Sequence, residues 1–210
     1  MRTGVNITLF FCRSHGSKII KSYLYAMQYL YMLLIGATPP NRHIEQHDVF
    51  FSIGGELKDM VPAIRDFWPE ANPRIHIDGW RRVTRVDGFT IEVIERTNET
   101  KESEAKLFFL NLGGYKPNEF EEYHYKMIVA GADKGVAVQQ AKQTAFYKHT
   151  GFKGAESHID DKYGVDVDDI YEITDILSPE LKKKYILRLT PAVGKEEDEI
   201  HLGYFKLDKL

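Results

Sequence analysis

The stretch LYMLLIGATPPNRHIEQHDVFFSI, residues 30–53, decides the fold because the chain repeats it 77 positions later. Residues 107–130 read LFFLNLGGYKPNEFEEYHYKMIVA, and seven of the 24 aligned positions are identical without a gap. The identical residues of the first stretch are Leu30, Leu33, Gly36, Pro40, Asn41, Glu45 and His47. Self-similarity at a fixed spacing is typical of repeated structural units, so two copies of one unit are predicted.

Shorter matches follow the long one in the same order. His76-Ile77-Asp78 aligns with His158-Ile159-Asp160, and Val86-Asp87-Gly88-Phe89 aligns with Val167-Asp168-Asp169-Ile170. We therefore place the first repeat at residues 28–96 and the second at 105–174. Residues 175–210 are expected to complete the fold with a short helix, N-capped by Ser178, and two strands at 185–189 and 200–207.

Each copy reads as two strands, a helix and two short closing strands. In the first copy apolar residues have helical spacing from Leu57 to Trp68, and a helix start with Asp59 as N-cap would put Pro62 in the first turn; in the second copy the helix begins after Asp133. The closing strands are predicted at 74–77 and 89–94, and at 157–159 and 167–173. The predicted class is α+β: two tandem ββαββ-like repeats related by a pseudo-twofold, with their sheets joined or their helices packed together.

Residues 1–26 have no counterpart ahead of the second copy. They contain basic residues and no Asp or Glu, and the apolar stretch at 23–37 begins near their end. A secretory signal, a weak membrane anchor and an extension without a structural role are the three interpretations. Because residues 30–36 align with a strand in the middle of the chain, the extension is favoured and residues 30–36 are predicted to form a core strand.

Composition excludes several classes of protein. The 210 residues are 43% hydrophobic and 28% charged, as in an ordinary globular protein, and the single cysteine, Cys12, excludes an intrachain disulfide or a cysteine-based zinc site. The net charge of −3 gives no general attraction to nucleic acid or to a membrane. A cytoplasmic location is expected, no cofactor is predicted beyond a divalent metal at the sites below, and a homo-oligomer stays open.

Three segments resemble the bacterial "domain of unknown function 1543" family: residues 42–71, the repeat at 107–130, and KQTAFYKHTGFKGAESHIDDKYGVDVDDIYEI at 142–173. The resemblance covers residues 28–190, and HIDDKYGVDVDDIYEI is its most specific motif. It implies a bacterial protein with two tandem copies of the family unit. It implies no activity, cofactor or catalytic residue.

Repeated acidic and histidine residues are the candidates for chemistry. Residues i and i+2 of a strand share a face, so each pair below would project a carboxylate and an imidazole together. Such groups bind a divalent metal or orient a general base, and otherwise they hydrogen-bond a loop to a strand. The candidates are Glu45, His47, His76 and Asp78 in the first copy, and Glu122, His124, His158 and Asp160 in the second.

Two further features are interpreted as structural. The basic and aromatic residues between Lys142 and Lys153 suit a helix end better than a nucleic-acid surface. The aspartates at 160–169 lack the spacing of an EF-hand. The sequence favours a non-catalytic binding or interaction protein over its alternative, a metal-dependent or His/Asp-assisted enzyme, and leaves the question of catalysis open.

Overall fold

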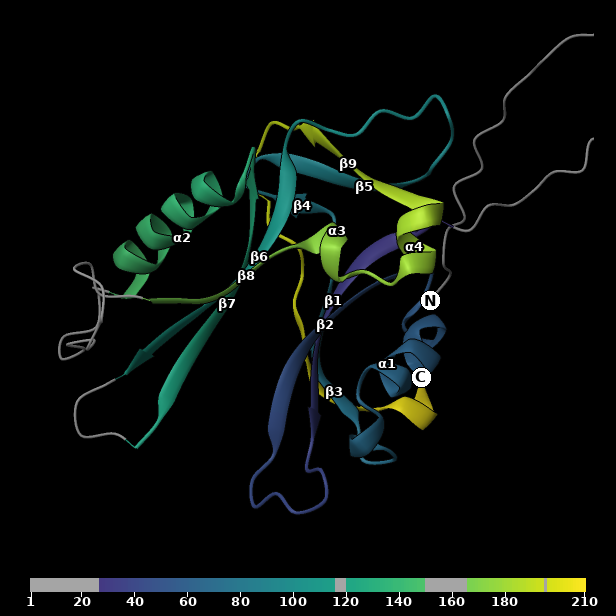
Figure 1. Cartoon of the computed structure of the whole chain (residues 1–210), viewed down its shortest axis with the longest axis vertical. Helices are drawn as coiled ribbons and strands as arrows, with labels where there is room; N and C mark the ends of the chain where they lie inside the picture. The colour runs from purple at the N-terminus through teal and green to yellow at the C-terminus, as the bar shows by residue number, and fades with distance from the viewer. Residues whose placement is uncertain (1–26, 116–119, 150–165, 195) are drawn as a thin grey trace, which may run out of the picture.

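The computed structural model describes residues 27–115, 120–149, 166–194 and 196–210, which form a mixed α+β fold of antiparallel strands (Figure 1). The strands are β1 (Tyr29–Ala37), β2 (Gln46–Gly54), β3 (His76–Val83), β4 (Arg85–Val86), β5 (Phe89–Glu95), β6 (Lys106–Tyr115), β7 (Glu122–Gly131), β8 (Asp166–Glu172), β9 (Tyr185–Pro191) and β10 (His201–Lys206). The helices are α1 (Val61–Phe67), α2 (Lys134–His149), α3 (Ile173–Ile176) and α4 (Pro179–Lys184), with single 3₁₀ turns at Leu57–Met60, Pro69–Ala71 and Leu207–Lys209.

The described strands form three sheets. The first has the order β10-β3-β1-β2, the second β4-β5-β9 and the third β7-β6-β8. Strand β1 is central in the first sheet. Its alternate residues point to opposite sides of the sheet, and buried residues occur on both sides. Tyr31, Leu33 and Ile35 lie in one apolar cluster with Met60 and Ile64, next to α1.

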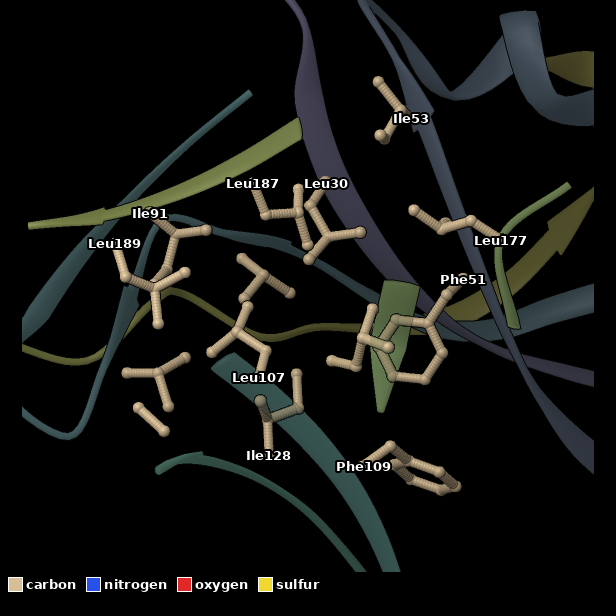
Figure 2. Packing of buried hydrophobic residues seen from close by; sticks show 14 of the residues in the cluster. Leu30, Phe51, Ile53, Ile91, Leu107, Phe109, Ile128, Leu177, Leu187 and Leu189 are labelled. Carbon is tan, nitrogen blue, oxygen red and sulfur yellow. The ribbon is translucent and has the colours of Figure 1, made fainter. Parts of the chain in front are cut away.

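The first and third sheets pack face to face through a central core (Figure 2). Leu30 of β1 and Phe51 of β2 lie on one side of this core, and Leu107 and Phe109 of β6 lie on the other. The rings of Phe51 and Phe109 meet edge to face with centroids 5.4 Å apart. Each fully buried side chain of this size contributes about 1.5–3 kcal/mol, so the core holds the two sheets together.

Helices α1 and α2 lie on opposite outer faces of this pair of sheets (Figure 1). Beneath α2, Ala137 and Ala141 are buried against Phe108 and Leu110 of β6. The expectation that the sheets join or that the helices pack together is therefore wrong. The first and third sheets each have two apolar faces. One face packs against a helix, and the opposite face packs against the other sheet.

Three strands of the first sheet, β3-β1-β2, correspond in order and register to β8-β6-β7 of the third sheet. Gly36 of β1 lies opposite His47 of β2, and Gly113 of β6 lies opposite His124 of β7. The pairing of β1 with β3 shifts between Leu34 and Ile35, and that of β6 with β8 shifts between the aligned residues 111 and 112. These bulges fall at the same aligned position. The tandem ββαββ unit and its pseudo-twofold stay predictions.

The closing strands differ from the sequence alignment. Strand β8 pairs with β6 as β3 pairs with β1, so Asp166 lies opposite Gly113 where His76 lies opposite Gly36. The alignment of residues 167–170 with 86–89 is therefore wrong, because β5 pairs with β4 and β9 in a separate sheet. The predicted strand at 157–159 lies outside the described residues.

Most of the predicted helix starts are confirmed. The Asp133 side chain accepts a hydrogen bond from the Val136 amide at 2.9 Å, and the Ser178 hydroxyl accepts one from Leu181 at 3.3 Å. The carboxylate of Asp59 instead accepts from the Gly55 and Glu56 amides, since the first helical turn is 3₁₀. Residues 30–36 lie in β1 as expected, and residues 1–26 lie outside the described residues. Within the described ranges, each helix is too short or too polar to cross a membrane.

Candidate metal centre

Four polar side chains gather around Gly36 on the face of the first sheet that is turned toward the third. Gly36 pairs with His47 on one neighbouring strand and with His76 on the other, so both rings flank the bare glycine. Asp78 sits in the β3 bulge, and Glu45 immediately precedes β2. We call Glu45, His47, His76 and Asp78 the Gly36 cluster; the four predicted residues of the first copy do come together.

Contacts within the Gly36 cluster are short and mutual. The Nε2 atom of His47 lies 3.0 Å from Asp78 Oδ2 and 3.8 Å from Glu45 Oε2. The Nε2 atom of His76 lies 3.1 Å from Glu45 Oε1 and 3.2 Å from Asp78 Oδ1. Each carboxylate therefore faces both imidazoles, and neither His–carboxylate pair stands alone.

His76 is the buried member of the cluster and its side chain is only 5% exposed. Its Nδ1 lies 3.2 Å from the carbonyl oxygen of Arg74, which can only accept, so Nδ1 carries a proton and donates it. The Nε2 atom has no hydrogen-bond partner of proper geometry, although two carboxylate oxygens lie within 3.2 Å. The Nε2 atom is therefore close to both carboxylates and hydrogen-bonded to neither.

Gly36 is required by this arrangement. A Cβ at this position would collide with Asp78 Oδ2, and it would lie 2.8 Å from His76 Nε2 and 3.1 Å from His47 Cδ2. Contacts below 3.0 Å cannot persist, so any side chain here would force the cluster apart. The sequence marked Gly36 only as a repeated residue, and the reason for the glycine appears when the strands are paired.

Tyr204 of β10 adds a residue that the sequence analysis missed. Its ring lies over the His76 ring, with centroids 4.2 Å apart and planes inclined by 34°. Tyr204 is 62% exposed and lies in the bulge of β10 that faces the bulge of β3. No local sequence pattern could link it to His76, because the two residues are 128 positions apart and meet only through strand pairing.

The second predicted set is not assembled in the described structure. Glu122 and His124 are neighbours on β7, with Glu122 Oε2 and His124 Nε2 4.0 Å apart. His158 and Asp160 lie outside the described residues. The position equivalent to His76 is held by Asp166, which shows that the alignment of the His-Ile-Asp motifs did not follow the strand register.

The separations in the Gly36 cluster are close to those between neighbouring ligands of one metal ion. Zinc–ligand distances of about 2.0–2.1 Å place tetrahedral ligands about 3.3 Å apart. The described residues contain no group of three or more His, Cys, Asp or Glu side chains already arranged to hold an ion. The donors touch one another instead, and Glu45 and His47 are the more exposed members of the cluster.

The comparisons with known proteins add a family and a fold. Residues 42–93 match the family described as Domain of Unknown Function (DUF1543), and this segment contains the whole Gly36 cluster. The crystal structure of a protein from Idiomarina loihiensis is similar over 86% of this chain and 97% of that one, with 24% identity and a TM-score of 0.56. None of the curated proteins compared with this chain matches it. The match supports the resemblance to the family, and the crystal structure supports the fold.

Proposed function

We propose that this chain binds one divalent metal ion of the first transition row, zinc foremost, through the Gly36 cluster, and that it acts as a metal-dependent enzyme. The observation that carries the proposal is the buried Nε2 atom of His76. It faces two carboxylates at 3.1 and 3.2 Å without a hydrogen bond to either. An ion between these atoms would join all three groups.

The hydrogen bond of His76 Nδ1 leaves Nε2 as the ring nitrogen that can bind a metal ion. With Nδ1 donating to the Arg74 carbonyl, Nε2 of His76 faces two anionic oxygens, and either a metal ion on Nε2 or a proton on Nε2 removes the repulsion between them. Metal-binding histidines commonly donate their second ring nitrogen to a backbone carbonyl, which fixes the tautomer and the ring orientation. Two imidazoles and two carboxylates suit zinc, manganese or nickel.

The cluster combines a fixed part with a movable part. His76 and Asp78 are held by burial and by the β3 bulge, whereas Glu45 and His47 have side chains 44% and 39% exposed. A site that keeps His47, His76 and Asp78 and releases Glu45 has three protein ligands and one open position, as catalytic zinc sites do. Zinc in such a site lowers the pKa of a bound water, and the released Glu45 would then serve as general base.

Calorimetric titration with zinc, manganese and nickel tests the proposal. We expect the full chain to bind one zinc ion, and we expect His76→Ala and His47→Ala to weaken binding at least about 100-fold. His43→Ala is the matched control, because His43 is exposed and close in sequence to the cluster without belonging to it. No heat of binding by the parent, or equal binding by all variants, would refute the metal site.

A non-catalytic binding or interaction protein is the second candidate, and the contact between His47 and Asp78 favours it. This 3.0 Å pair ties β2 to β3 across β1, which a purely structural role would require. If the pair serves stability alone, His47→Ala lowers the unfolding free energy of the metal-free chain by about 1–3 kcal/mol. The metal proposal predicts a loss below about 1 kcal/mol, because both side chains are partly exposed.

A further inference from the structure

Arg81 of β3 lies on the same face of the first sheet as the Gly36 cluster. It pairs with Met32, whereas His76 pairs with Gly36, and residues 32 and 36 of β1 share a face. His76 and Arg81 are five positions apart, a spacing that would put them on opposite faces of a regular strand. The bulge between them restores the common face, and bulges often re-aim a side chain beside a functional site.

Arg81 is a half-buried cation. Burial lowers its pKa, and the more distant charges of Asp198 and Glu197 oppose that effect. Asp198 is already engaged, since its carboxylate accepts hydrogen bonds from the Thr84 and Arg85 amides. Among the described residues, none forms a hydrogen bond or an ion pair with the Arg81 side chain. Charges withdrawn from water are normally paired, so we expect this guanidinium to bind an anion.

The surface between Arg81 and the cluster is apolar. Gly79 lies between them on the same face, opposite Leu34 of β1 and Leu202 of β10. The Leu202 side chain lies over Gly79, with its Cδ2 atom 3.1 Å from where a Cβ would stand, and yet it is 77% exposed. At about 3.3 Å per residue, His76 and Arg81 are roughly 13–16 Å apart along the strand.

We propose that the Gly36 cluster and Arg81 bind the two ends of one small acid, and this inference rests on the metal site proposed above. One oxygen-bearing end would complete the coordination of the metal. A carboxylate or phosphate at the other end would take the bidentate hydrogen bonds that a guanidinium offers. An apolar spacer would contact Leu34 and Leu202. The substrate class is therefore a small organic acid with polar groups at both ends and a hydrocarbon middle.

Titration of the zinc-loaded full chain with a series of probes tests this inference. Adipate carries two carboxylates, hexanoate carries one, and a six-carbon acid with a phosphonate at one end separates phosphate-like from carboxylate recognition. We expect adipate or the phosphonate to bind at least ten times more tightly than hexanoate. Arg81→Met should abolish that preference while zinc affinity stays unchanged, and Arg81→Lys should restore part of it.

Arg188→Met is the matched control, because it removes an exposed arginine that pairs with Glu92 far along the chain from the cluster. It should leave both zinc and acid binding as in the parent. Zinc uptake without any preference for the two-ended acids, or a preference that survives Arg81→Met, overturns this inference alone. Absence of zinc uptake by the parent overturns the metal site and this inference together.

Discussion

The first and third sheets have the same strand pairing around their central strands, but different residues occupy one of the paired positions. Both have a central strand with a glycine opposite a histidine, and both have a bulge at the same aligned position. In the first sheet His76 fills the place beside Gly36, and in the third Asp166 fills the place beside Gly113. Strand register therefore determines where a site beside the central glycine can form. The residue opposite that glycine, on β3 or on β8, determines what such a site can bind.

Replacement of Gly36 and of Gly113, one at a time, should give the largest difference between the two sheets. Gly36→Ala would drive a methyl group into Asp78 Oδ2 and His76 Nε2, so we expect zinc affinity to fall at least about 100-fold. Gly113→Ala should leave zinc affinity within about twofold of the parent, because the proposed ion lies in the other sheet. Calorimetry on both variants measures the difference; equal effects of the two substitutions would contradict the assignment to Gly36.

The helix that covers each sheet offers a second contrast, this time in stability. Ile64 of α1 is fully buried, whereas Trp68 at the end of α1 is only partly buried. We expect Ile64→Ala to lower the unfolding free energy by about 2–5 kcal/mol and Trp68→Ala by about 2 kcal/mol. Denaturant unfolding gives both values. A larger loss for Trp68→Ala than for Ile64→Ala would show that the tryptophan is the main anchor of this helix.

A charged pair in the third sheet should give the smallest effect. Burial alone would raise the pKa of Glu172, but hydrogen bonds from Lys106 and Thr174 outweigh it and hold that pKa below its ordinary value. A lowered carboxyl pKa contributes stability above the ordinary value of about 4.3, and the contribution disappears as the pH falls through the folded-state pKa. Glu172→Gln should therefore cost less than about 1 kcal/mol at pH 7.

Thermal melts at pH 7 and at pH 3 check this prediction. The parent and Glu172→Gln should differ at pH 7, and the difference should shrink as the pH falls through the folded-state pKa of Glu172. A difference that persists unchanged at the lower pH would mean that Glu172 acts through packing and not through its charge.

Much of the Gly36 cluster could be predicted because its members obey short-range rules. Glu45 and His47, like His76 and Asp78, are two residues apart, and that spacing on a strand brings their side chains to one face. That the two pairs meet depends on β2 and β3 both flanking β1, which the repeat did not determine. Strand pairing joins residues that are far apart in sequence, so local sequence patterns predict it only weakly.

The missed features have a common cause. The bulge in β3 inverts the face that Arg81 would occupy, and β10 brings Tyr204 to His76 from the end of the chain. Residues 158–160 were aligned with 76–78 because the amino acids are identical. The strand that pairs with β6 in the third sheet begins at Asp166 instead. A short motif can recur beside a strand without occupying the equivalent register.

Anomalous scattering from crystals soaked in zinc tests the central claim most directly, because it locates the ion. The account predicts one strong peak per chain beside Gly36, within about 2.0–2.2 Å of His47 Nε2, His76 Nε2 and an Asp78 oxygen. The peak should persist in His124→Ala and disappear in His76→Ala. Absence of a peak at Gly36 in the parent, or a peak that survives the loss of His76, would contradict the account.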